Sequence, residues 1–141
     1  MLKKYFAVRL TAVDTEVVML VIRVVAGVAM AMHGWGKIQN PMAWMGPDAA
    51  IPGVFQFLAA FAEFVGGLAL ALGVLTRLSA LGIAITMLVA ALFHAVVLKD
   101  PFVAKGGGSY ELATLHLLIN LFFVVQGPGR FSLDAKVFGQ R

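Results

Sequence analysis

Four long apolar segments constrain the fold of this 141-residue chain more than any other feature. Each approaches the ~20 residues that a helix needs to cross a ~30 Å hydrocarbon layer, and a lone strand cannot satisfy its backbone in lipid. Only 13% of the residues are charged, whereas a soluble domain carries about a quarter. We therefore predict an all-α integral membrane protein, a bundle of four transmembrane helices. The segments span residues 17–32, 54–75, 78–98 and 110–126.

Turn and capping signals between these segments set the expected bounds within one membrane domain, residues 1–141. Residues 1–14 place apolar side chains at helical spacing, which predicts an amphipathic segment on the membrane interface. Residues 127–141 are expected to form a cytoplasmic tail after the "GPG" that ends the last helix. The helices are expected at about 15–33, 54–76, 78–98 and 109–126.

The distribution of Lys and Arg predicts the orientation. If both termini share one side, that side carries seven basic residues and the other side carries three. We therefore expect a multi-pass membrane protein with both termini in the cytoplasm. The first group is Lys3, Lys4, Arg9, Arg77, Arg130, Lys136 and Arg141, and the second is Lys37, Lys99 and Lys105.

Composition also excludes several kinds of function. The chain has no cysteine, so it supplies no disulfide, thiolate metal site or dithiol redox pair. No basic run with interleaved aromatic residues suggests nucleic-acid binding. Any electron transfer must therefore use a bound cofactor or a partner protein.

Two charged residues of opposite sign interrupt the apolar segments. An ionised side chain in mid-membrane costs ~2.5–3.5 kcal/mol on insertion scales and usually has a partner inside the bundle. With the first helix ending at His33, Arg23 and Glu63 both lie ~14–15 Å below the outer surface at ~1.5 Å per residue. We predict an Arg23–Glu63 ion pair, whose role is either structural or functional. Small residues beside each charge should let the first two helices pack closely.

A second polar group is expected toward the outer leaflet, where three histidines from three helices lie at similar depth. Imidazole titrates near neutrality, so this group could pass protons or hydrogen-bond a ligand. Each member also has an ordinary explanation, such as an interfacial anchor or a helix-terminal charge. Haem ligation by two histidines is the weaker alternative, because no spacing motif supports it, and no metal site is predicted. The residues in question are His33, Trp35, Lys37, His94, Glu111, His116 and Asn120.

Several motifs together resemble the DoxX family of small bacterial membrane proteins, and DoxD-like proteins related to it. They are "RVVAGVAMAMHGWGK" (23–37), "AEFVGGLALALGVLTRLSAL" (62–81) and the closing "GPGRFSLD" (127–134). The resemblance implies a four-helix bundle in the cytoplasmic membrane and an association with oxidoreductase systems, including quinone-coupled thiosulfate oxidation in DoxD proteins. The family's recurrent residues fall on Arg23, His33, Gly34, Lys37, Glu63, Gly66, Gly67, Arg77 and Arg130.

These observations predict a membrane subunit of an oxidoreductase system that binds a quinone in an outer-leaflet pocket. Glu63, His33 and His116 are the expected catalytic residues, in proton transfer to and from the quinone. A redox partner protein would supply electrons. The expected cofactor-binding residues are Arg23, Trp35, Lys37, His94, Glu111 and Asn120.

Two other functions stay open. One is a membrane scaffold with no enzymatic role, and the other is a carrier of lipid or another small molecule. The small-residue helix faces could pack within one chain or between the chains of a homo-oligomer.

Overall fold

The structure is a computed structural model that describes Val8 and residues 11–140. It contains five α-helices and one π-helical turn, with no strand among the described residues. The elements are α2 (Val13–Ile38), α3 (Gly53–Leu72), α4 (Thr76–Leu92), the π-helical turn η1 (Phe93–Val97), α5 (Glu111–Gln126) and α6 (Leu133–Phe138). The predicted amphipathic segment, residues 1–14, lies largely outside the described residues.

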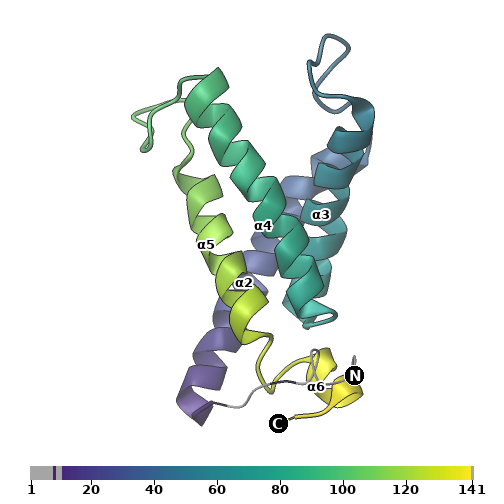
Figure 1. The fold of residues 1–141 in the computed structure, drawn as a ribbon, viewed down its shortest axis with the longest axis vertical. Helices are drawn as coiled ribbons and strands as arrows, with labels where there is room; N and C mark the ends of the chain where they lie inside the picture. Colours follow the sequence, from purple (N-terminus) through teal and green to yellow (C-terminus); the bar gives the residue numbers. More distant parts are fainter. Residues whose placement is uncertain (1–7, 9–10, 141) are drawn as a thin grey trace.

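The helices form two packed pairs joined through α3 and α4. α2 packs on α3 and α4 packs on α5, while residues 73–75 connect α3 to α4 in a tight turn. In Figure 1, α2 passes behind α4 and α5 on its way to α3, and the upper ends of α3 and α4 diverge. We call the end with loops 39–52 and 98–110 the loop end, and the opposite end, where α2 begins and α5 stops, the terminal end.

Three described helical segments are long and apolar enough to cross a membrane: α2, α3, and α4 continued through η1 to Val97. α5 is apolar but has only 16 residues. Large apolar side chains stay exposed along all four helices, as expected of a protein whose solvent is lipid. The structure thus confirms an all-helical chain with three long apolar helices and a shorter fourth, whereas four full crossings and cytoplasmic termini stay predictions.

The first helix ends later than predicted. It continues through His33 to Ile38, because "HGWGKI" has no proline and Gly36 lies in open space, where it weakens the helix without stopping it. This extension adds more than one turn to α2. It carries Lys37 to the depth of Glu63.

Glycines let α2 and α3 approach each other to backbone contact, as predicted. A Cβ atom on Gly27 would lie 2.5 Å from the Ala71 nitrogen, and one on Gly67 would lie 2.6 Å from the Ala31 nitrogen. Such distances are too short for any side chain, so only glycine fits at these two positions.

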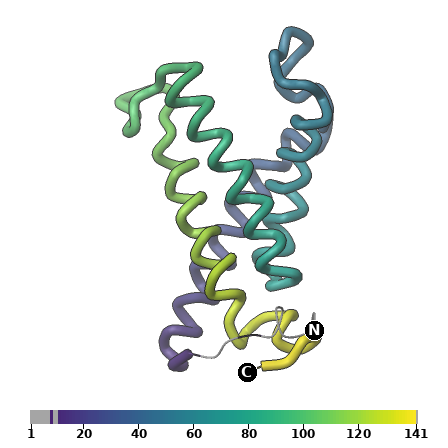
Figure 2. Tube along the Cα trace, viewed as in Figure 1, coloured from purple at the N-terminus to yellow at the C-terminus, as the bar shows by residue number. Residues whose placement is uncertain are grey.

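The C-terminal segment is not a free tail, because it folds back under the α3–α4 turn. Figure 2 shows this segment crossing the terminal end of the bundle. Both carboxylate oxygens of Asp134 accept backbone hydrogen bonds, from Leu75 (2.7 Å) and Thr76 (2.8 Å). These donors open α4 and have no partner within that helix, so Asp134 caps α4 from a distant part of the chain. This contact also holds Leu75 in its left-handed conformation, φ 43°.

Candidate functional site: a cavity around Lys37 and Glu63

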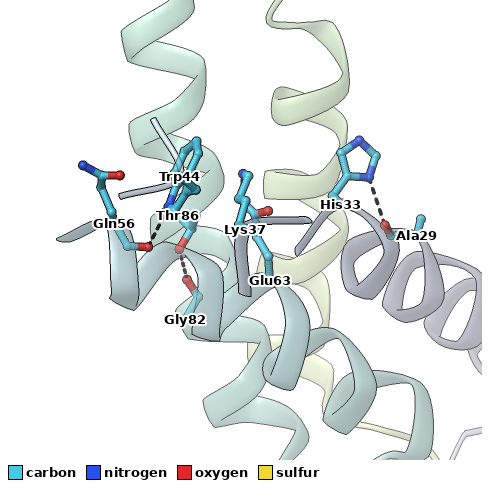
Figure 3. Close-up of polar contacts among 8 residues, drawn as sticks. All are labelled: Ala29, His33, Lys37, Trp44, Gln56, Glu63, Gly82 and Thr86. Carbon is cyan, nitrogen blue, oxygen red and sulfur yellow. Dashed lines mark hydrogen bonds and ion pairs between the residues drawn. The ribbon is translucent and has the colours of Figure 1, made fainter. Parts of the chain in front are cut away.

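Glu63 pairs with Lys37 and not with Arg23. The Lys37 Nζ atom lies 2.6 Å from Glu63 Oε1, and the Glu63 side chain is only 2% exposed. Figure 3 shows the two side chains meeting between α2 and α3. The predicted Arg23–Glu63 ion pair is therefore wrong. α2 continues past His33 and includes Lys37, which lies at the depth of Glu63. Arg23 lies 14 residues earlier on the same helix, about 21 Å closer to the terminal end at ~1.5 Å per residue.

Arg23 is instead part of the terminal end. Its guanidinium donates to the carbonyl oxygens of Phe131 (2.6 Å) and Leu70 (3.2 Å), and Asp134 attracts it electrostatically. Arg23 is 1% exposed and does not line the cavity described below. Its partners tie α2 to the end of α3 and to the C-terminal segment.

A cavity of ≈ 820 Å³ lies beside the Lys37–Glu63 pair, between α3, α4 and the loop that follows α2. Its size falls within the ~300–1,000 Å³ of typical small-molecule sites. Most of the lining is apolar, with a few polar side chains. The lining residues are Lys37, Trp44, Met45, Ala50, Ile51, Pro52, Phe55, Gln56, Leu58, Ala59, Glu63, Ile85, Thr86, Val89, Ala90, Phe93 and His94.

Gln56 holds the loop over this cavity. Its side-chain amide accepts from the Met45 backbone N–H (3.1 Å) and donates to the Ile51 carbonyl (2.8 Å). The backbone carbonyl of Gln56 accepts a third hydrogen bond, from the Trp44 indole N–H (3.0 Å). The Lys37 Nζ atom lies 4.5 Å from the centre of the Trp44 ring, a cation–π contact. The tryptophan on the cavity wall is thus Trp44, whereas the predicted cofactor-binding tryptophan was Trp35.

Trp35 lies outside the cavity and is 59% exposed. Its ring contacts that of Phe64, with centroids 5.4 Å apart. This position suits an interfacial anchor. Trp44, by contrast, follows Lys37 by seven residues in a loop that returns to α3.

Two of the predicted histidines form a separate group with Asn120. The rings of His33 and His116 lie 6.4 Å apart, centre to centre. Each Nδ1 atom approaches the carbonyl four residues earlier on its own helix, Ala29 for His33 (2.9 Å) and Leu112 for His116 (3.1 Å). None of the three residues lines the cavity, and Figure 3 shows His33 turned toward Ala29, apart from the Lys37–Glu63 pair.

Asn120 lies one turn from His116, as predicted, and donates to the His116 carbonyl (2.8 Å). Its Oδ1 atom is buried without a hydrogen-bond partner among the described residues. Glu111 begins α5, is partly exposed and does not line the cavity. The structure therefore divides the predicted site, because only Glu63, Lys37 and His94 of its nine residues lie on the cavity.

His94 has a partner that sequence reasoning missed. Its Nδ1 atom lies 2.7 Å from Asp100 Oδ2. The six-residue spacing gave no signal, because it suits neither an α-helix nor a strand. The contact between His94 and Asp100 becomes possible because α4 widens into η1 and because Lys99 takes a left-handed conformation, φ 57°.

No group of three or more potential metal ligands (His, Cys, Asp or Glu) comes together within the described residues. The polar groups at the cavity are the Lys37–Glu63 ion pair, His94 with its partner Asp100, and the neutral side chains of Gln56 and Thr86.

Comparison with known proteins identifies the family. The DoxX family model matches residues 18–95, more than half of the chain. This chain belongs to the DoxX family. The match covers α2, α3 and α4, and so contains Lys37 and Glu63.

Three curated relatives extend the similarity across most of the chain. The DoxX protein is 36% identical to "Inner membrane protein YqjF" of Escherichia coli K12 over 84% of this chain and 91% of that protein. It is 33% identical to an uncharacterized protein of Haemophilus influenzae, over 83% and 88%. It is 29% identical to "Putative oxidoreductase CatD" of Bacillus subtilis, over 87% and 89%. No solved structure matches this chain.

Family membership and the apolar helices together make this DoxX protein a multi-pass protein of the inner membrane. The exposed apolar side chains along its three long helices therefore face lipid.

Proposed function

We propose that this DoxX protein is a membrane subunit of an oxidoreductase system and binds a quinone, or a similar apolar redox molecule, beside Lys37 and Glu63. The observation that carries the proposal is the ≈ 820 Å³ cavity, whose mostly apolar wall contains an ion pair between the buried Glu63 and the partly exposed Lys37. A quinone needs such a wall for its ring and tail, and hydrogen-bond donors for its carbonyl oxygens.

The residues present fit that requirement. The Lys37 ammonium has three donors, of which Glu63 Oε1 uses one, so donors remain for a carbonyl oxygen in the cavity. Glu63 Oε2 is buried without a hydrogen-bond partner among the described residues. An unsatisfied carboxylate oxygen costs free energy, and such groups are frequent at functional sites.

A bound quinone would supply the redox chemistry, taking up two electrons and two protons on reduction. The Lys37–Glu63 pair would position one carbonyl oxygen and exchange a proton there. The electrons come, in this proposal, from a redox partner protein, because the chain has no cysteine and so has no dithiol of its own that could supply them. The relative named a putative oxidoreductase supports redox chemistry in general terms but identifies no quinone. His33 and His116 stay predicted proton-transfer residues without a place on the cavity.

The decisive experiment identifies what the purified protein carries. Protein extracted gently in native lipid should contain a quinone that chromatography and ultraviolet absorbance detect at a fixed ratio to protein. The Glu63→Gln variant should retain several-fold less quinone. The matched control, Asp48→Asn, removes a carboxylate from an exposed loop position outside the cavity lining and should retain the wild-type amount.

A carrier of lipid or another apolar molecule is the second candidate, because the same apolar cavity would suit it. Bulk lipid alone in the purified protein, together with no response of the bound molecule to a reductant, would favour the carrier and contradict the redox proposal. A scaffold function gains no support from the cavity.

A further inference from the structure

We propose that His94 and Asp100 form a proton-exchange pair at the rim of the cavity, which couples the protonation of His94 to the redox state of the bound molecule. This inference rests on the proposed function and adds to it a residue, Asp100, and a ligand form, the hydroquinone.

The backbone at the end of α4 brings Asp100 back onto His94. The helix widens into η1, closed by the Leu98 N–H bond to the Phe93 carbonyl (3.0 Å). Lys99 then adopts φ 57°, a left-handed conformation that is unfavourable for a residue with a side chain. Asp100 follows and bonds His94 twice, its N–H to the His94 carbonyl (2.9 Å) and its carboxylate to the ring. π-helical turns and strained residues of this kind gather at functional sites.

The Asp100 carboxylate determines which ring nitrogen is free. An ionised carboxylate only accepts hydrogen bonds, so the Nδ1 atom of His94 must carry the proton in that contact. In a neutral ring Nε2 is then an acceptor, and it has no hydrogen-bond partner among the described residues. The ring lines the cavity and is 36% exposed. An aspartate behind a histidine is the arrangement that orients an imidazole for proton transfer.

The consequence for a ligand follows from hydrogen-bond chemistry. Neutral His94 accepts from a phenolic hydroxyl, which a hydroquinone has and a quinone lacks. Protonated His94 donates to a carbonyl oxygen, which the quinone has. The affinity ratio of hydroquinone to quinone should therefore be higher when His94 is neutral, at higher pH, than when it is protonated. The other titratable groups around the cavity are Lys37 on α2 and Glu63 on α3, and Lys99 adjoins Asp100 in the loop.

Tryptophan fluorescence can test this directly. The chain has two tryptophans, so a Trp35→Phe background leaves Trp44, on the cavity wall, as the reporter. A short-chain ubiquinone analogue with a decyl tail should quench Trp44 on binding, and its hydroquinone form should displace it under anaerobic conditions. Between pH 5.5 and 8 the affinity ratio should change about tenfold in favour of the hydroquinone, the effect of one hydrogen bond to a charged or neutral ring.

Two variants and one control distinguish the possible failures. His94→Gln should abolish the pH dependence while both molecules still bind. Asp100→Asn should reduce the change, because an amide can donate as well as accept and so no longer fixes the proton on the Nδ1 atom of His94. Asp48→Asn should leave the wild-type profile. A ratio that varies with pH equally in wild type and His94→Gln would overturn the pair but leave the proposed function intact. Absence of Trp44 quenching by either molecule would overturn both.

Discussion

Removing Lys37 should destabilise this protein more than removing the charge of Glu63, although both changes break the same ion pair. The side chain of Glu63 is 2% exposed, and that of Lys37 is 26% exposed. Lys37→Met leaves a buried carboxylate without its counter-charge, which costs about 3 kcal/mol or more. Glu63→Gln leaves an ammonium that reaches the cavity and an amide oxygen that can still accept from it, so the loss should be about 1 kcal/mol.

The double variant measures the coupling. In Lys37→Met/Glu63→Gln no charge is buried, so we expect a loss of about 1–2 kcal/mol, less than that of Lys37→Met alone. The cycle should give a coupling energy of about −2 kcal/mol, outside the usual ~0.3–0.5 kcal/mol for independent sites.

Unfolding in mixed detergent micelles, with increasing dodecyl sulfate and far-ultraviolet circular dichroism as the signal, gives these free energies. Equal losses for the two single variants would contradict the argument, since it depends on their unequal burial. A double variant whose loss equals the sum of the single losses would also contradict it, because the two side chains would then not interact.

The remaining predictions concern other parts of the fold. Gly27→Ala would put a Cβ atom 2.5 Å from a backbone nitrogen of α3, so it should cost at least about 3 kcal/mol or prevent folding, whereas Gly36→Ala, in open space, should stabilise by up to about 1 kcal/mol in the same micelle assay. Asp134→Asn removes one of two acceptors at the start of α4 and should cost about 1–2 kcal/mol, against no change for the exposed Asp48→Asn; equal unfolding midpoints would refute this cap. Gln56→Leu should release the loop that follows α2, so limited proteolysis should cut that loop several-fold faster, and an unchanged cutting rate would show that the amide does not hold it.

Features that depend on composition and helical periodicity were predicted from the sequence. Apolar segment lengths indicated the helices, and Gly27 and Gly67 indicated the close approach of α2 and α3. Both signals are local, because lipid requires helices and a missing side chain permits contact wherever it occurs.

The ion pair was wrong because a depth estimate accumulates errors in helix bounds. The error of five residues at the end of the first helix accounts for about 7.5 Å of the ~21 Å between Arg23 and Lys37 along α2. The rest arises because Glu63 lies ten residues inside α3 whereas Lys37 is next to the last residue of α2, so the ends of the two helices do not lie at the same depth. The His94–Asp100 pair and the cap from Asp134 had no sequence signal, since each depends on where a loop or tail returns. Both were therefore accessible only from the structure.

The two ends of the bundle use their carboxylates differently, and this difference argues for where the ligand binds. At the terminal end, Glu16 and Asp134 each accept hydrogen bonds on both oxygens, from backbone N–H groups or the Thr11 hydroxyl. Such carboxylates are already satisfied, and Arg23 beside them donates to backbone carbonyls. At the loop end, Glu63 has one oxygen without a partner among the described residues and lines a cavity. Because these two carboxylates join α2 and the start of α4 to the C-terminal segment through satisfied hydrogen bonds, the terminal end has the character of a structural clasp. Arg23 Nε, Thr76 Oγ1 and Arg130 Nε also lack hydrogen-bond partners among the described residues, but none of them lines the cavity. A buried carboxylate oxygen without a partner and a cavity beside it come together at the loop end, which favours that end as the place where a ligand binds.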